Sequence, residues 1–93
     1  MEIIIQEDSN KGYAMARVNG VRAGVMTYSK AGDNLIIIDS TDVYDAYKGQ
    51  GIGKNMLYKI VEMARKKNIK IIPLCPFSVS VFKKNAEISD VLK

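Results

Sequence analysis

Hydrophobic and polar positions alternate over the first part of the chain. Residues 2–6, 13–18 and 21–28 each show the pattern of a strand, and Asn19-Gly20 is a typical dipeptide of a tight hairpin turn. The continuous apolar run 35–39 predicts a strand that is buried on both faces. The first forty residues therefore predict an antiparallel meander.

A helical spacing replaces this alternation after residue 50. We expect a helix at 51–67, whose apolar stripe consists of Ile52, Met56, Leu57, Ile60, Val61 and Ala64. Asn68 can adopt the left-handed conformation that ends a helix. Residues 69–75 then predict a short strand, and residues 77–85 predict a short helix or turn. A right-handed crossover through the main helix would place strand 69–75 parallel to strand 35–43.

These elements predict one α+β domain that spans residues 1–93. A chain of this length buries only about 60–65% of its unfolded surface, which is enough for one two-layer core. The expected fold is a mixed sheet in which the antiparallel meander precedes a β-α-β unit with a main amphipathic helix. A short C-terminal helix completes the chain.

The composition excludes several kinds of chemistry. The 93 residues contain no histidine and a single cysteine, Cys75, so a structural zinc site, a Ser–His–Asp triad and an internal disulfide all lack their residues. Apolar runs such as Leu35–Ile38 are far shorter than the roughly 20 residues of a membrane span, and Glu2 does not suit a signal peptide. We therefore expect a cytoplasmic protein without a metal site or a membrane partner.

The charges are distributed unevenly. Residues 48–84 carry nine basic side chains and one acidic one, whereas the rest of the chain carries five basic and nine acidic ones, for a total of +4. An anionic partner would suit the basic half, and a solvated lysine-rich helix face is the alternative.

Three alternate glycines, Gly49, Gly51 and Gly53, precede the expected main helix. Backbone N–H groups are unpaired at the start of a helix and the helix dipole is positive there, so such a turn can bind phosphate. The alternative is that the glycines only allow the helix and the strand to pack closely. Two known phosphate-binding patterns do not fit: Lys48 and Asn55 break the Walker pattern, and Lys54 breaks the dinucleotide pattern.

The segment Val43–Leu57 resembles the pyrophosphate-binding motif of the GNAT N-acetyltransferases, Arg/Gln-x-x-Gly-x-Gly/Ala. Lys48, Gly51 and Gly53 fill its fixed positions, with lysine in place of the usual arginine or glutamine. Together with the segment 71–77, Ile-Ile-Pro-Leu-Cys-Pro-Phe, the whole chain is similar to the small, roughly 90-residue GNAT-like proteins.

This resemblance implies that acetyl-CoA is bound across a splay between the strand ending near Val43 and strand 69–75. The backbone near Val43 would pair with the pantetheine arm, and the glycine turn would hold the pyrophosphate, which also suits the basic half of the chain. The residues implied to bind coenzyme A are Val43, Lys48, Gly49, Gln50, Gly51, Ile52, Gly53 and Lys54.

The implied reaction transfers acetyl to an amine acceptor, a small molecule or a protein lysine, at an open cleft that only residues 7–12 can wall. Cys75, at the position of the family's cysteine, and Asp39, a carboxylate near the expected site, are the candidate catalytic residues. Their simpler explanations are a buried small side chain and a turn cap. The small family often carries histidine where this chain has Ser40, so that residue's role does not carry over.

Two other functions compete with acetyl transfer. One is a coenzyme A-binding or interaction module without turnover. The other is nucleic-acid binding, which the basic half and two tyrosines beside Lys48 favour, but no groove-reading motif is present and the chain has only seven aromatic residues. We therefore do not expect a nucleic-acid partner.

Overall fold

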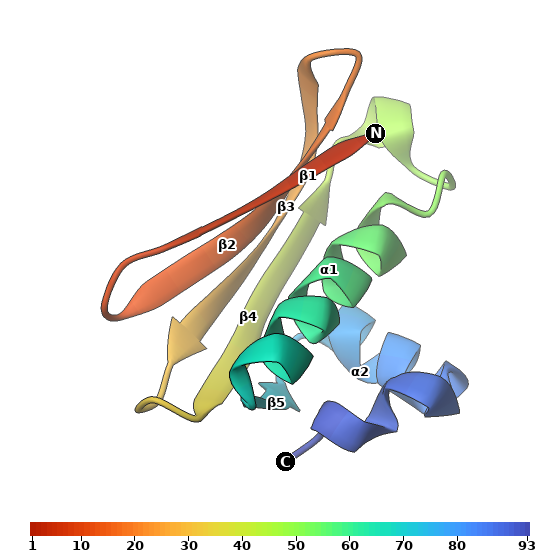
Figure 1. The fold of residues 1–93 in the computed structure, drawn as a ribbon. Coiled ribbons are helices and arrows are strands. Elements are labelled where there is room, and N and C mark those ends of the chain that lie inside the picture. The colour runs from red at the N-terminus through yellow and green to blue at the C-terminus, as the bar shows by residue number, and fades with distance from the viewer.

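The strands pair in the order in which they occur along the chain, β1-β2-β3-β4-β5, and all but the last pair are antiparallel (Figure 1). The computed structural model describes all of residues 1–93. The strands are β1 (Glu2–Glu7), β2 (Lys11–Val18), β3 (Val21–Lys30), β4 (Leu35–Val43) and β5 (Lys70–Pro73). β5 pairs with β4 in parallel, so the predicted meander and crossover are both confirmed. β5 is shorter than the predicted 69–75.

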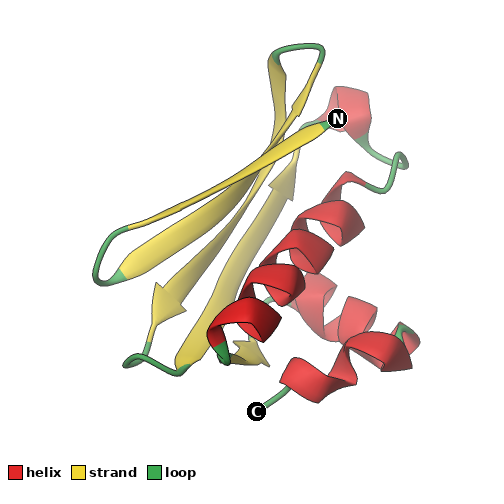
Figure 2. Ribbon diagram, in the orientation of Figure 1, coloured by secondary structure: helices red, strands yellow, loops and turns green.

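The helices lie together on one side of the sheet (Figure 2). They are the 3-10 turn η1 (Asp45–Tyr47), the main helix α1 (Ile52–Lys67), the short helix α2 (Pro76–Lys84) and the 3-10 segment η2 (Ala86–Val91). The main helix and the short C-terminal helix are where the sequence predicts them. None of these helices is long and apolar enough to cross a membrane.

The predicted turn residues adopt the conformations that their chemistry favours. Asn19 and Gly20, between β2 and β3, have φ values of 52° and 79°, as a tight hairpin turn requires. Asn68 ends α1 with φ at 58°, where its backbone N–H donates to the carbonyls of Ala64 and Arg65.

The core lies between α1 and one face of the sheet. The entire predicted stripe of α1 is buried there, and Ala14 and Ala16 of β2 leave room for the helix to approach closely. Ile36 and Ile38 of β4 point into this core, but Leu35 and Ile37 are only half-buried. The prediction that 35–39 is buried on both faces is therefore wrong, because no helix covers the second face.

A bulge in β4 reverses the alternation of its side chains. Tyr28 of β3 pairs with Ile38 and Thr27 pairs with Ser40, so Asp39 is an extra residue. Ser40 contacts Thr27 Oγ1 at 2.6 Å on the face away from α1, which we call the open face. Residue 41 consequently returns to the face that carries the helices.

The two parallel strands, β4 and β5, separate at Ile38, where the bulge of β4 begins. Within β4, only Leu35–Ile38 pair with β5. The N–H groups of Leu74 and Cys75 both donate to the carbonyl of Ile38, at 3.0 and 3.3 Å, and end the pairing. The edge of β4 beyond Ile38 therefore has no strand beside it, which gives the sheet the splay that the resemblance implied.

Candidate functional site

A pocket of about 400 Å³ lies between the free edge of β4 and the start of α1. We call it the turn pocket; its lining residues are Thr41, Val43, Tyr47, Lys48, Gly49, Gly51, Ile52, Gly53, Lys54 and Phe77. The structure thus brings together every predicted coenzyme-binding residue except Gln50. The side-chain amide of Gln50 instead donates to the carbonyl of Ala46 at 3.5 Å.

Gly49 and Gly51 are glycines for a conformational reason. Their φ values are 81° and 77°, in the left-handed region that side chains disfavour. A Cβ atom at Gly49 would have no neighbour within 4 Å, and one at Gly51 would meet only Asn55 Nδ2 at 3.7 Å. The backbone on this side of the turn is therefore open to a ligand.

The start of α1 is an uncompensated positive end of a helix. Gly51 is its N-cap residue, no side chain accepts a hydrogen bond from the first turn, and that turn contains no acidic residue. The first N–H groups of a helix lack partners within the helix, so they are free to donate to an anion. This arrangement fits the pyrophosphate of a coenzyme.

Two lysines flank the turn. Lys48 Nζ lies 3.0 Å from Asp45 Oδ1, but both side chains are largely exposed, so the pair is weak. Lys54 Nζ lies 5.4 Å from the centre of the Tyr58 ring. Both amines can therefore exchange their present contacts for a phosphate at little cost.

Gly53 has a different environment from the other two glycines. It lies inside α1 with helical geometry and is buried. A Cβ atom at Gly53 would lie 2.5 Å from Cζ and 2.8 Å from Cε2 of Phe77. The sequence left two explanations open for these glycines, phosphate binding and close packing. Close packing applies to Gly53, but its packing partner is α2 and not a strand.

Cys75 lies beside the turn pocket. The residue is buried, 8% exposed, and its thiol lies 3.2 Å from Thr41 Oγ1 and 3.1 Å from Ser78 Oγ. Ser78 also donates to the carbonyl of Cys75 at 2.9 Å, which holds the start of α2. Thr41, which links the thiol to the pocket, was missed by sequence reasoning because only the bulge turns it to this face.

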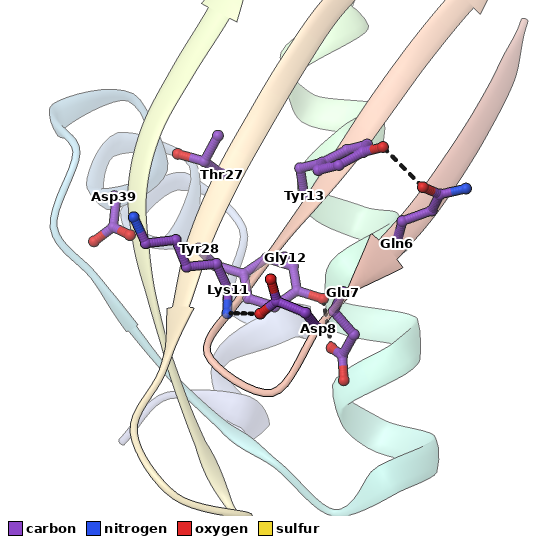
Figure 3. Close-up of a pocket in the computed structure, with 9 residues that line it drawn as sticks. All are labelled: Gln6, Glu7, Asp8, Lys11, Gly12, Tyr13, Thr27, Tyr28 and Asp39. Carbon is purple, nitrogen blue, oxygen red and sulfur yellow. Dashed lines mark hydrogen bonds between the residues drawn. The ribbon is translucent and has the colours of Figure 1, made fainter.

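Asp39 lies in a second pocket of about 620 Å³, which we call the open-face pocket (Figure 3). Its other lining residues are Gln6, Glu7, Asp8, Lys11, Gly12, Tyr13, Thr27 and Tyr28. Asp39 is exposed and accepts a hydrogen bond from Ser29 Oγ at 2.5 Å, and Lys11 points toward it. The structure therefore does not bring Asp39 and Cys75, the two predicted catalytic residues, into one pocket. Their catalytic roles stay predictions.

The other carboxylates of the open-face pocket are already engaged. Glu7 accepts hydrogen bonds from Lys30 Nζ and from the hydroxyl of Tyr28, both at 2.7 Å, and these contacts lower its pKa. Burial, and then Glu7, raise the pKa of Tyr28 well above its usual range. The N–H groups of Asn10 and Lys11 lower the pKa of Asp8. Asp39 Oδ1 has no hydrogen-bond partner, and neither has Asp8 Oδ2.

Comparisons with known proteins agree with this geometry. The sequence model of the GCN5-related N-acetyltransferases matches residues 12–91. The solution structure of a GCN5-like protein from Staphylococcus aureus is 37% identical, with a TM-score of 0.70, over 97% of this chain and 87% of that one. None of the curated proteins matches the sequence.

More distant solved structures share the fold. Ribosomal-protein-alanine N-acetyltransferase from Brucella melitensis is 18% identical, with a TM-score of 0.72, over 83% of this chain and 62% of that one. A protein related to streptothricin acetyltransferases from Bacillus anthracis, in complex with acetyl-CoA, is also 18% identical, with a TM-score of 0.65. The alignment covers 83% of this chain and 46% of that one, so this chain spans about half of its length.

Proposed function

The chain belongs to the GCN5-related N-acetyltransferase family, whose reaction transfers acetyl from acetyl-CoA to an amine, and we propose that its two pockets divide this reaction. The turn pocket would hold the coenzyme, and the open-face pocket would receive the acceptor. The observation that carries this proposal is the turn pocket itself. It joins the free edge of β4 to a glycine turn at the uncapped start of α1.

The residues of the turn pocket fit acetyl-CoA in charge and in shape. The N–H groups after Gly51 would bind the pyrophosphate, and Lys48 and Lys54 would add positive charge at the rim. The free backbone edge near Val43 offers hydrogen bonds to an amide-bearing chain such as pantetheine. When bound, acetyl-CoA supplies a thioester from which an amine can take the acetyl group.

The contacts of the Cys75 thiol support a role in positioning rather than a role as acetyl acceptor. The thiol contacts two hydroxyl groups, Thr41 Oγ1 and Ser78 Oγ, and no basic side chain. A thiol without a base is a poor acetyl acceptor at neutral pH. We therefore propose that the amine takes the acetyl group directly, at the splay between β4 and β5.

Asp39 is the carboxylate best placed to serve the acceptor. Its neighbour Ile38 accepts the N–H of Cys75, so Asp39 lies beside the splay but on the open face. Its Oδ1 can bind the ammonium group of an acceptor and then hold the proton that the nitrogen must lose before it attacks. The pocket is open to solvent, so both a small amine and the side chain of a protein lysine remain candidates.

The single free thiol of this chain suits a reducing compartment, and we propose that the protein works in the cytoplasm.

The test has two stages. Calorimetry with acetyl-CoA should first give a saturable binding isotherm. A panel of acceptors, comprising polyamines, aminoglycosides and lysine peptides, should then be screened for acceptor-dependent release of the coenzyme thiol. Absence of coenzyme binding by the folded protein would contradict the proposal, whereas binding without thiol release from any acceptor would favour the module without turnover.

A further inference from the structure

We propose that Phe77 is a coenzyme-binding residue, that its ring forms the wall against which the pantetheine arm packs, and that Gly53 lacks a side chain in order to seat this ring. This inference rests on the proposed function, because it names a binding residue in the same pocket.

The ring of Phe77 is exposed where an apolar residue would normally be covered. Phe77 is 40% exposed, and among the large exposed apolar residues it alone lines the turn pocket. Pro76 at the first position of α2 fixes the backbone that carries it. An aromatic ring held in this way at the wall of a pocket is available to bury part of a ligand.

The ring of Phe77 gives a packing reason for the glycine at position 53. The φ of Gly53 is not positive, so its backbone conformation does not itself require glycine. The three atoms nearest to an added Cβ are all ring carbons of Phe77, at 2.5, 2.8 and 3.2 Å. A side chain at 53 would push the ring away from its present position.

The position of the ring indicates which part of the coenzyme it meets. Phe77 follows Cys75 by two residues and contacts the first turn of α1, just after Gly51. It therefore lies between the turn that suits phosphate and the thiol that marks the thioester end. An uncharged chain with methyl and amide groups fits an apolar wall, whereas a phosphate does not.

A double-mutant cycle tests the inference. Affinity is measured for coenzyme A and for a nucleotide fragment that keeps the pyrophosphate and lacks the pantetheine arm. Phe77→Ala should weaken coenzyme A binding about tenfold and leave fragment binding unchanged, since only the arm loses its apolar contact. Gly53→Ala alone should have a similar effect, and it should add nothing in the Phe77→Ala background. Phe77→Leu should retain most of the affinity.

The controls separate this inference from the proposed function. Leu74→Ala removes an apolar side chain that is 62% exposed but does not line the pocket, and it should change neither affinity. Circular dichroism checks that each variant is folded. If wild-type protein binds coenzyme A and Phe77→Ala binds it equally well, the inference is wrong while the proposed function stands. If Gly53→Ala weakens both ligands in both backgrounds, Gly53 serves the phosphate instead. Failure of the wild type to bind contradicts the proposed function itself.

Discussion

The two pockets lie on opposite sides of the bulge in β4, and they are built in different ways. Most of the turn pocket comes from residues 47–54, which are consecutive in the sequence. The open-face pocket takes its residues from four strands and holds them by long-range contacts, such as that between Glu7 and Lys30. A pocket made of consecutive residues can be recognised from a motif, whereas one made across a sheet depends on the register of every strand.

The two pockets also differ in the chemical groups that line them. The turn pocket offers backbone donors, two lysines and an apolar wall, and it contains no carboxylate. The open-face pocket is lined by three acidic residues: Glu7 is paired with Lys30 and Tyr28, Asp8 accepts two backbone N–H groups, and Asp39 accepts one hydrogen bond, from Ser29. An anionic coenzyme on one side and a cationic amine on the other would each meet the opposite charge.

The largest expected effect is that of Asp39→Asn. If the open-face pocket serves the acceptor, this change should lower kcat about 100-fold and leave the Kd for acetyl-CoA unchanged, because a positioned base contributes about two orders of magnitude or more. Steady-state thiol release and calorimetry on the same sample measure both quantities. Asp42→Asn, an exposed carboxylate nearby on β4 that lines neither pocket, is the matched control. If kcat falls equally in Asp39→Asn and Asp42→Asn, the loss is not specific to the open-face pocket, and the proposed division of the reaction between the two pockets is wrong.

A second prediction concerns the turn pocket alone. Gly51→Val should weaken acetyl-CoA binding by at least about 30-fold, or about 2 kcal/mol, because the side chain obstructs the backbone donors and strains a residue with φ at 77°. Gly32→Val is the control, since Gly32 has φ at 89° and equally open surroundings in the β3–β4 turn. Both variants should lose similar stability, and only Gly51→Val should lose affinity. Unchanged affinity in folded Gly51→Val would leave this glycine a purely conformational role.

These contrasts explain which features were visible in the sequence. The hairpin at Asn19-Gly20, the stripe of α1 and the parallel position of β5 follow from local pattern and chain connectivity, and they were predicted. The residues from Lys48 to Lys54 could be named as candidates because the motif is contiguous, and they need no long-range information to be located in the sequence. Thr41 and the separation of Asp39 from Cys75 depend on one bulge, and the pairing of Gly53 with Phe77 joins two helices. No local pattern carries such information.

A third prediction distinguishes the roles of Cys75. Cys75→Ser should lower the free energy of unfolding by about 1 kcal/mol, because a more polar hydroxyl replaces a buried thiol, and it should leave turnover per folded molecule nearly intact. Urea denaturation and thiol release measure these two quantities. A covalent route would instead require turnover to fall by orders of magnitude. It would also require acetyl-Cys75 to be visible by mass spectrometry after rapid quenching, with loss of that group on addition of an amine.

A fourth prediction tests the ionic contacts that hold the open-face pocket. The pKa of Glu7 is lowered in the folded state, so its contribution to stability is present above the pKa of the unfolded chain and is lost as the pH falls through the folded-state value. Glu7→Gln should therefore destabilise the protein at pH 7 by up to about 1 kcal/mol and by less at pH 3. Urea midpoints at the two pH values measure this. Glu2→Gln, which removes an exposed carboxylate without an ion pair, should change neither midpoint.

The smallest expected effect is that of Lys48, at the rim of the turn pocket. Lys48→Ala should weaken acetyl-CoA binding only about threefold, because the amine is exposed and water screens its charge. The loss should shrink as salt is raised from about 0.05 to 0.5 M, as expected for an attraction between exposed charges. Lys59→Ala, on α1 but outside the turn pocket, removes the same charge and is the control for net charge. A loss at Lys48 that persists at high salt would indicate a direct, desolvated contact with phosphate. A loss shared equally with Lys59→Ala would indicate that the basic half attracts the coenzyme as a whole, without a specific role for the rim.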